Sequence, residues 1–316
     1  MKKIFFSFNP PEGSYGGGSF FVKNFVNFLK LKKYIITFKL EENIDFIFII
    51  DPRKRKKYNK KYSLKDFINY KKCNPNTKII HRVNDCDLKR NSDSKLEPLM
   101  IETMKKSDFV IFVSNWMKLY YHKKYNLNLN CSSIINGCDS KIFFQNFQIK
   151  DFKNKKIKIV THHFSDNYLK GFEIYNQIDK LLNNNNCNFT FTFVGNYNKD
   201  YQPKNIKLLK ATQGIELANI IRDHDIYLTA TQFEPGAMHY VEGLSCGLPI
   251  LFRKNGGGAF EVCNKCGLEF NNMDDFLIKL KLLVDKYDIF RNNIDYFFLS
   301  SKRCSEEYYK LIEKIN

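Results

Sequence analysis

The stretch DIYLTATQFEPGAMHYVEGLSCGLPILF, residues 225–252, carries the pattern from which the fold follows. An apolar run at 226–230 predicts a buried strand, a polar loop follows it, and a helix is expected to begin at Gly236. A second apolar run at 249–252 predicts the next strand. A strand, a helix and a further strand within this length are typical of a parallel sheet with helices on its faces.

The same alternation of apolar runs and segments with helical spacing continues along the whole chain of 316 residues. Further strands are expected at 4–8, 34–38, 46–50, 78–82, 109–114, 132–136, 157–161, 189–195 and 206–209. The fold class that follows is α/β, with two facing Rossmann-like domains whose parallel sheets carry flanking helices. A polar, lysine-rich stretch at 148–156 predicts the linker between a domain 1–150 and a domain 151–298. Ligands of such sheets bind beyond the carboxyl ends of the strands, so the expected site is the cleft between the domains.

Composition limits the class of protein. The chain has 43% hydrophobic and 27% charged residues, enough apolar material for a sizeable core, which argues against disorder. Apolar runs such as 46–50 have five residues, far short of the roughly 18 to 20 that span a bilayer. Nine scattered cysteines favour reduced thiols over a disulfide framework. Because the amino terminus lacks the apolar core of a secretory signal, a cytoplasmic protein is expected.

The net charge of +18 is unevenly distributed along the chain. Residues 1–150 carry +16 and residues 151–316 carry +2. The densest basic run extends from Arg53 to Lys61, directly after an apolar strand. Such a cluster attracts phosphates, as in nucleic acid, an anionic membrane surface or an acidic acceptor. The alternative is a solvated loop in a lysine-rich chain.

Two carboxylates stand eight positions apart within the stretch 225–252. Glu234 lies in the loop after the strand, and Glu242 lies nearly two turns into the helix. Between them, the backbone amides of Gly236, Ala237 and Met238 are expected at a helix amino terminus, which can bind a diphosphate. One carboxylate on each side could then accept hydrogen bonds from sugar hydroxyls.

A glycine run, Gly16 to Gly18, separates the first strand from the first helix. Glycine allows the backbone to approach a ligand closely, and the helix that follows offers free amides. The run is not GxGxxG, and no acidic residue stands where it would bind a ribose, so a nicotinamide dehydrogenase is disfavoured.

Together these motifs resemble the retaining glycosyltransferases of family 4, which have the two-domain GT-B fold. Glu234 and Glu242 match the family's E-x7-E signature, and CGLPILFRKNGGGAFEV is similar to the segment that follows it. Further matching segments are VSNWMKLYY from Val113, SIINGCDSKIF from Ser133, LKGF from Leu169, FTFVGN from Phe191 and DIYLTAT from Asp225. The resemblance covers nearly the whole chain and rests on the shared order of these segments.

The resemblance implies retaining transfer of a sugar from a nucleoside diphosphate sugar to a glycan, lipid-linked or other hydroxyl acceptor, without a cofactor. It implies that Glu234 binds the hydroxyls of the donor sugar, Glu242 the ribose and Lys170 the diphosphate, with Gly17 and Gly18 against the donor phosphates and the acceptor. The amino-terminal domain would bind the acceptor and the carboxyl-terminal domain the donor. The last helix, within 299–316, would cross back to the first domain.

The sequence departs from the family at two positions. The family pairs the lysine equivalent to Lys170 with an arginine at the end of the preceding strand, where His162 stands here. Counted back from Lys170, the equivalent position is nearer Phe164. A protonated His162 could bind the donor in the arginine's place, and the alternative is that Arg253 or Lys254 supplies the missing charge. The family's Glu-Gly-Phe-Gly reads Glu-Pro-Gly-Ala here, which keeps the carboxylate. His81 loosely matches a family position that faces the donor sugar, and a buried histidine with satisfied hydrogen bonds is the alternative.

The function expected is therefore a glycosyltransferase, in which Lys170 and helix amides stabilise the departing diphosphate while the acceptor hydroxyl attacks from the same face. A sugar-nucleotide epimerase or a glycan phosphorylase on the same scaffold remains an alternative. A basic nucleic-acid-binding protein is a further one, although no RNA-binding signature is present, so no nucleic acid is expected. Peripheral contact with an anionic membrane is expected through the run from Arg53 to Lys61. No metal site is expected, because the lone Cys263–Cys266 pair lacks two further ligands.

Overall fold

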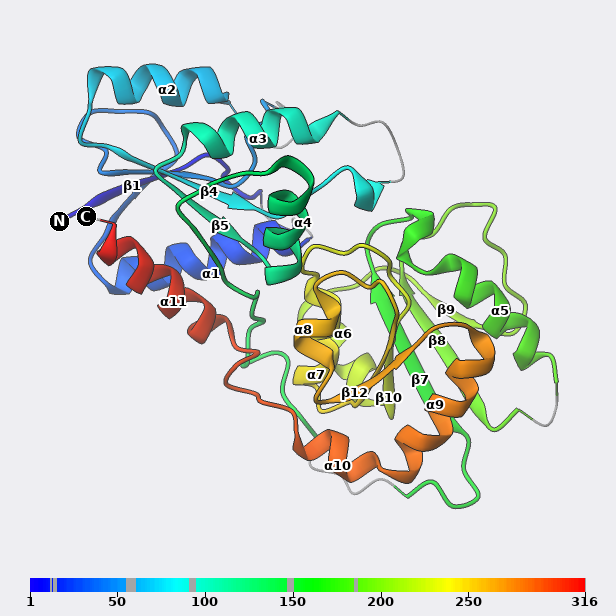
Figure 1. Cartoon of the computed structure of the whole chain (residues 1–316). Coiled ribbons are helices and arrows are strands. Elements are labelled where there is room, and N and C mark those ends of the chain that lie inside the picture. Colours follow the sequence, from blue (N-terminus) through cyan, green and yellow to red (C-terminus); the bar gives the residue numbers. More distant parts are fainter. Residues whose placement is uncertain are drawn as a thin grey trace. The chain divides into compact units, whose positions relative to one another are not determined.

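The computed structural model describes residues 1–11, 13, 16–54, 61–90, 95–146, 151–184 and 187–315. The chain forms two compact units, one of Met1–Gly137 with Ser301–Asn316 and one of Cys138–Ser300. Each unit contains one six-stranded parallel sheet with helices on both faces (Figure 1). The α/β fold class with parallel sheets and flanking helices is thereby confirmed for each unit.

The first unit is built on a sheet of order β2-β1-β3-β4-β5-β6. Its strands are β1 (Lys3–Phe6), β2 (Ile35–Thr37), β3 (Phe46–Ile49), β4 (Lys78–Val83), β5 (Phe109–Phe112) and β6 (Cys131–Ser133). Its helices are α1 (Gly17–Leu31), α2 (Leu64–Cys73), α3 (Leu96–Lys106), α4 (Asn115–Tyr125) and α11 (Ser301–Lys314). Alternate strand residues face opposite sides, so Phe6, Phe48 and Ile80 pack with α1 and α11, and Ile47 and Ile79 pack with α2.

The last helix, α11, completes the core of this unit by packing beside α1 (Figure 1). Its Tyr308 is fully buried, and the centroid of its ring lies 4.7 Å from that of Phe21 and 5.5 Å from that of Phe25. The strand residue Phe48 closes the cluster from the sheet side at 6.0 Å. Residues at the carboxyl end of the chain are therefore part of the amino-terminal core.

The second unit is built on a sheet of order β12-β11-β10-β7-β8-β9. Its strands are β7 (Ile157–His163), β8 (Phe189–Gly195), β9 (Lys207–Leu209), β10 (Ile226–Thr229), β11 (Ile250–Arg253) and β12 (Gly267–Phe270). Its helices are α5 (Phe172–Leu182), α6 (Gly214–Arg222), α7 (Met238–Ser245), α8 (Ala259–Cys263), α9 (Met273–Asp285) and α10 (Tyr287–Asn292). Helices α5 and α9 cover one face, and α7 and α8 contact strands of the same sheet from the other side.

The expected strands are all present, with ends that differ by a few residues. The strand β12 was not expected, because Gly267–Phe270 is short and includes a glutamate. Helix α7 begins at Met238 rather than at Gly236, because Ala237 has an extended backbone with φ −77° and ψ 154°. The division into 1–150, 151–298 and 299–316, with acceptor and donor roles, stays a prediction.

Candidate active site

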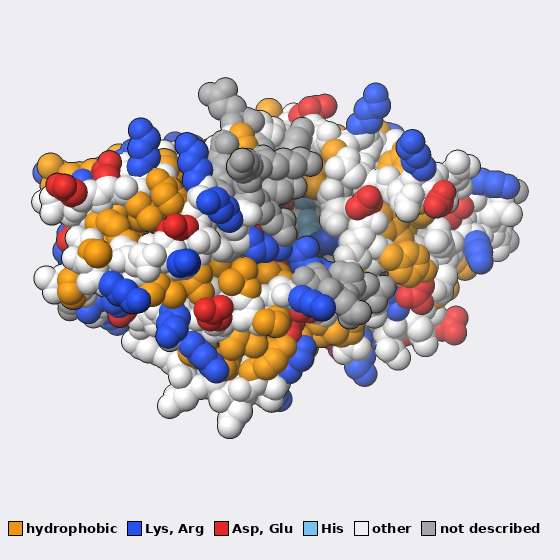
Figure 2. Space-filling model, turned by 90° about the horizontal axis from the view of Figure 1, so that it is seen from above, with side chains coloured by type: hydrophobic (Ala, Val, Ile, Leu, Met, Phe, Trp, Pro, Cys, Tyr) orange, Lys and Arg blue, Asp and Glu red, His pale blue; other side chains and the backbone are white. Residues whose placement is uncertain are grey.

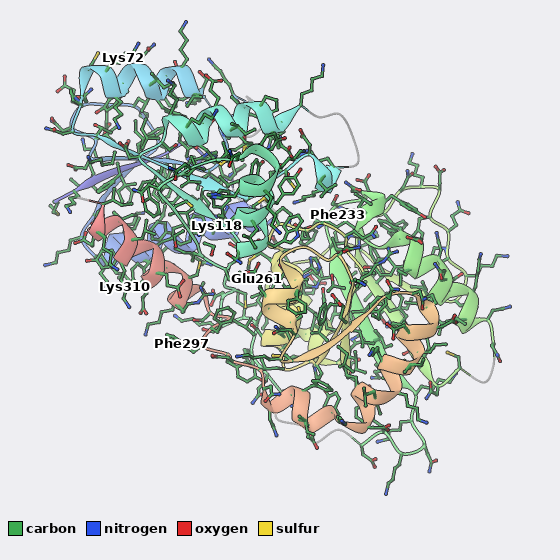
Figure 3. The ribbon with its side chains drawn as sticks, viewed as in Figure 1. Lys72, Lys118, Phe233, Glu261, Phe297 and Lys310 are labelled. Carbon is green, nitrogen blue, oxygen red and sulfur yellow. The ribbon has the colours of Figure 1, made fainter. Side chains whose placement is uncertain are left out.

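The residues expected to bind the donor in the second unit lie at the carboxyl ends of β7 and β11 and in the segments that follow β7 and β10. Lys170 ends the short 3-10 helix η3 (Tyr168–Lys170) after β7, and Glu234 lies in the loop between β10 and α7. Figure 3 labels Phe233, the residue before Glu234, in this part of the unit. Carboxyl ends of parallel strands share one edge of a sheet, so these parts of the chain lie together at that edge.

Lys170 and Glu234 form a buried ion pair. The Lys170 Nζ donates a hydrogen bond to Glu234 Oε2, and the two side chains are 12% and 4% exposed. Removal of one partner would leave the other charge buried and without compensation, which would destabilise the protein strongly. The structure thus brings together the two residues that the sequence suggested as the diphosphate-binding and sugar-binding groups, 64 positions apart.

The backbone around Glu234 is fixed by the glycine loop after β11. The Gly258 amide donates to the Glu234 carbonyl oxygen at 2.8 Å, and the Phe233 amide donates to the Asn255 carbonyl oxygen at 2.8 Å. Gly257 has φ +71°, and a Cβ on it would lie 2.3 Å from the Glu234 carbonyl oxygen. Only glycine fits this contact, which gives the glycine segment that follows the E-x7-E signature a structural reason.

Glu242, the second carboxylate of the site, is held by His162, which lies near the end of β7. The His162 Nε2 lies 2.7 Å from Glu242 Oε2, and both side chains are almost fully buried. On its other side the His162 Nδ1 lies 3.0 Å from the hydroxyl of Tyr227 on β10. His162 therefore binds Glu242, whereas the sequence suggested it as a diphosphate ligand.

The adjacent His163 faces the opposite side of the sheet, because strand side chains alternate. Its ring packs against Phe193 and Phe172, with centroids 4.7 and 5.3 Å away, and burial lowers its pKa well below the usual value. His239 of α7 shares the side of His162, and its Nε2 lies 2.8 Å from Thr229 Oγ1. Burial likewise lowers the pKa of His239 well below the usual value, so this ring stays neutral.

The start of α7 is the place where the sequence predicts backbone amides that bind a diphosphate. The Ala237 amide donates to the Tyr240 hydroxyl at 3.0 Å, so this N–H is engaged within the helix. Gly236 lies two residues before the helix, and Met238 is its first residue and half-buried. The role of these three residues in binding the donor stays a prediction.

Arg253, which the sequence suggested as a source of the missing charge, forms an ion pair with Glu173. It is the last residue of β11, and its Nη2 donates to Glu173 Oε2 of α5 at 2.9 Å. Glu173 is 45% exposed on its side chain, so the pair lies near the surface. Binding of the donor by Arg253 would require it to exchange this partner.

In the first unit, Gly17 and Gly18 are the first two residues of α1, after Gly16 with φ +100°. The positive φ makes Gly16 the glycine that the turn needs, whereas a Cβ on Gly18 would meet Asn84 at an ordinary 3.8 Å. Gly17 and Gly18 belong to a different unit from Lys170 and Glu234, and their contact with the donor stays a prediction.

His81 is fully buried on β4, and both of its ring nitrogens lack a hydrogen-bond partner within the described part of the chain. Burial lowers its pKa to about 3, with Asp51 opposing the shift. The alternative of a buried histidine with satisfied hydrogen bonds is therefore wrong for the described residues. A catalytic role for His81 stays a prediction.

The basic run from Arg53 to Lys61 lies partly outside the described residues, because 55–60 are not described. Arg53 itself points inward, with its Nε 2.8 Å from Asp51 Oδ1 and its Nη2 3.4 Å from Asp85 Oδ2. Figure 2 shows Lys and Arg side chains spread among acidic ones over the coloured part of the surface drawn there. Arg53 does not support membrane contact, because its side chain is paired with two carboxylates. Membrane contact through the rest of this run stays a prediction.

Among the residues described, no group of three or more His, Cys, Asp or Glu side chains is arranged to hold a metal ion. Within the same residues, no helix is both long and apolar enough to cross a bilayer.

The sequence did not point to Tyr227 and Gly243. Tyr227 contacts the His162 ring, and Gly243 packs against the ring of Tyr227. A Cβ on Gly243 would lie 2.4 Å from the Tyr227 ring, so the helix residue after Glu242 must be glycine for this ring to fit. Tyr227 stands between Ile226 and Leu228 in a buried strand, which is the signal in the sequence that its hydroxyl needs a partner.

Comparison with known proteins gives structural likeness without sequence likeness. No family model matches the chain, and no curated protein matches it by sequence. Sucrose-phosphate synthase from Thermosynechococcus elongatus superposes with a TM-score of 0.72 at 12% identity, covering 100% of this chain and 99% of that one. HepE from Anabaena, solved with UDP and glucose, gives 0.73 at 12% identity, covering 99% and 100%. A glycosyltransferase from Rickettsia africae gives 0.69 at 14% identity, covering 99% and 98%.

These likenesses confirm the fold class that the sequence predicted, and at this level of identity they show the fold alone. They extend over nearly the full length of both chains in each comparison.

Proposed function

We propose that the protein is a glycosyltransferase that moves a sugar from a nucleoside diphosphate sugar to a hydroxyl acceptor. One observation carries the proposal: the two carboxylates of the E-x7-E signature each have a basic partner, Lys170 at the end of η3 for Glu234 and His162 near the end of β7 for Glu242. A pair of oriented carboxylates with an adjacent ammonium suits a ligand that combines sugar hydroxyls with a diphosphate.

In this proposal Glu234 accepts hydrogen bonds from the donor sugar, and Lys170 moves from Glu234 toward the diphosphate when the donor binds. The ammonium then stabilises the negative charge that develops on the leaving nucleotide. This electrostatic stabilisation is strongest in a site that excludes water. Glu242 binds the ribose. Retention at the anomeric carbon and membership of family 4 are part of the proposal and rest on the sequence motifs.

The ligands of a similar structure suggest the first donor to test. HepE has been solved with UDP, with UDP and glucose, and with UDP-glucose. Because fold likeness does not fix the base or the sugar, we propose a uridine nucleotide as the leading candidate and hexoses as candidate sugars. The excess charge of the first 150 residues favours an anionic or phospholipid-linked glycan as acceptor.

A thermal-shift panel of nucleoside diphosphates and their sugars tests the proposal. A ligand at 100 times its dissociation constant stabilises the folded protein by about 2.7 kcal/mol, which a melting curve detects readily. We expect UDP and at least one UDP-sugar to raise the melting temperature, also with EDTA present if no metal is needed. A folded protein that responds to no member of the panel contradicts the proposal.

Product analysis separates the proposal from enzymes of related chemistry. A transferase forms no new sugar nucleotide from donor alone and releases the nucleoside diphosphate faster when an acceptor is added. An epimerase converts the donor without an acceptor, and a phosphorylase releases sugar phosphate from a glycan and inorganic phosphate. Either of these two product patterns would replace the proposed activity.

A further inference from the structure

A hydrogen-bonded chain of three side chains crosses the buried space between β7, β10 and α7. It runs from the Tyr227 hydroxyl to the two ring nitrogens of His162 and on to Glu242, with successive distances of 3.0 and 2.7 Å. Tyr227 is fully buried and His162 is 2% exposed. The three residues come from separate elements, so the chain exists only in the folded unit.

The direction of the hydrogen bonds follows from the surroundings of Tyr227. Its hydroxyl oxygen accepts from the His162 backbone amide at 3.2 Å. Its own hydrogen can reach the His162 Nδ1 at 3.0 Å and the His162 carbonyl oxygen at 3.4 Å, and the ring nitrogen is the nearer of these two. Burial raises the pKa of Tyr227 well above its usual value, so the hydroxyl keeps this hydrogen.

The tautomer of His162 follows from that direction. If Nδ1 accepts from Tyr227, the ring carries its proton on Nε2, and Nε2 donates to Glu242 Oε2. Both ring nitrogens are then used, and neither remains to contact a diphosphate. The Glu242 carboxylate is held through one oxygen, and no hydrogen bond to Oε1 is present within the described part of the chain.

We propose that Tyr227 and His162 are positioning residues that fix the Glu242 carboxylate, with Oε1 left to accept a hydrogen bond from a ribose hydroxyl of the nucleoside diphosphate. The inference rests on the proposed function and adds two residues and a proton position to it. Gly243 is part of the arrangement, because a Cβ there would displace the Tyr227 ring. His162 acts through Glu242 and not on the phosphates.

The replacement Tyr227→Phe tests this positioning with the smallest change in shape. We measure dissociation constants for UDP and for 2′,3′-dideoxy-UDP, which lacks both ribose hydroxyls, by isothermal titration calorimetry. The wild type should prefer UDP by about tenfold or more, as for a hydrogen bond to a charged group. In Tyr227→Phe the affinity for UDP should fall about tenfold, while that for the dideoxy nucleotide changes little, so the preference approaches one.

The matched control is Tyr201→Phe, which removes a buried hydroxyl of the same unit that has no hydrogen-bond partner within the described residues. It should leave both affinities at the wild-type values. Nitrogen-15 NMR of the imidazole rings, with His162 assigned through His162→Gln, gives a readout independent of ligand. It should show the His162 proton on Nε2 in the wild type.

Two results would overturn the inference: a UDP preference in Tyr227→Phe equal to that of the wild type, or a His162 ring protonated on Nδ1 in the wild type. If the wild type binds no nucleoside diphosphate, the proposed function fails, and the NMR result alone then decides whether the Tyr227–His162–Glu242 chain is directed as described.

Discussion

The carbonyl oxygen of Glu234 lies only 2.3 Å from the point where Gly257 would carry a Cβ. Glu234 is therefore positioned twice, through its side chain by Lys170 and through its backbone by a loop from the next strand. The backbone contact explains why Gly257, with φ +71°, follows β11, although it is distant in sequence from the two carboxylates.

Gly257→Ala should destabilise the protein and displace Glu234. The new methyl group meets backbone, which cannot move aside cheaply, and the positive φ adds strain, so we expect a loss of more than about 2 kcal/mol in urea unfolding. The control Gly214→Ala has a similar φ of +63° with no atom within 4 Å, and should cost about 1 kcal/mol. Equal losses in both variants would show that the contact with Glu234 is not the cause.

Lys170→Ala should lower turnover by about 10²- to 10³-fold, the usual effect of removing one group that stabilises developing charge. Lys170→Arg keeps the positive charge and should retain more activity. The exposed Lys180 on α5 provides the control, because Lys180→Ala leaves the Glu234 pair intact. Steady-state rates are compared below each variant's melting temperature, since the loss of a buried ion-pair partner also destabilises. Near-normal turnover in Lys170→Ala would contradict its role.

His81 should make the stability of the protein depend on pH. Its pKa is lowered to about 3 in the folded state, so the unfolded state binds the extra proton between that value and about 6.5. The stability is therefore full above about pH 6.5 and is lost as the pH falls, by up to about 1.4 kcal/mol per pH unit from this residue.

Urea unfolding of the wild type and of His81→Leu at pH 7, 6 and 5 checks this dependence. Leucine adds no titratable group and leaves no ring nitrogen without a partner. The variant should lose less stability than the wild type between pH 7 and pH 5, although other buried histidines keep part of the slope in both proteins. Parallel pH profiles would show that His81 is not neutral in the folded state.

Glu97 should be a strong contributor to the stability of the first unit. The carboxylate accepts hydrogen bonds from the Tyr120 hydroxyl and from Lys124 Nζ, both at 2.7 Å, and from the hydroxyl of Tyr125. Burial opposes ionisation, but these donors hold the pKa of Glu97 below its usual value. Glu97→Gln weakens these charge-assisted bonds and should cost about 1.5 to 3 kcal/mol at pH 7.

The exposed Glu102 on the same helix, α3, gives the control variant Glu102→Gln, which should change stability by less than about 0.5 kcal/mol. Because the folded pKa of Glu97 is lowered, its contribution is present above pH 4.5 and is lost as the pH falls below it. The difference between wild type and Glu97→Gln in chemical denaturation should therefore shrink at acid pH. A constant difference would mean that the charge of Glu97 is not responsible.

Tyr308→Ala should destabilise the first unit although it lies eight residues from the end of the sequence. The ring fills the space between Phe21, Phe25 and Phe48, and removing a buried aromatic ring costs about 3 to 5 kcal/mol. Lys310, labelled on the same helix in Figure 3, is exposed, and Lys310→Ala should leave the melting temperature unchanged. Equal melting temperatures for both variants would show that α11 does not contribute to this core.

Much of the site follows from local sequence. Glu234 and Glu242 are recognisable because the strand before them and the helix between them have clear apolar periodicities, and Lys170 precedes a helix after the adjacent strand. The strand pattern also locates these residues at the carboxyl edge of one sheet, because parallel strands all end there.

The partners of these residues do not follow from the sequence. That Lys170 meets Glu234, that His162 meets Glu242 and that Arg253 is taken by Glu173 depends on which strands are neighbours, and the order β12-β11-β10-β7-β8-β9 is a tertiary choice. The alternation along β7 decides that His162 and not His163 faces α7, and one residue of shift would reverse it.

The sequence by itself determined the fold class, the parallel sheets and the two carboxylates, because these depend on periodicity within short segments. The tertiary structure alone decided the pairing of charges, the partners of the His162 ring and the membership of α11 in the first core. These properties depend on distances between residues far apart in the chain, which no local pattern encodes.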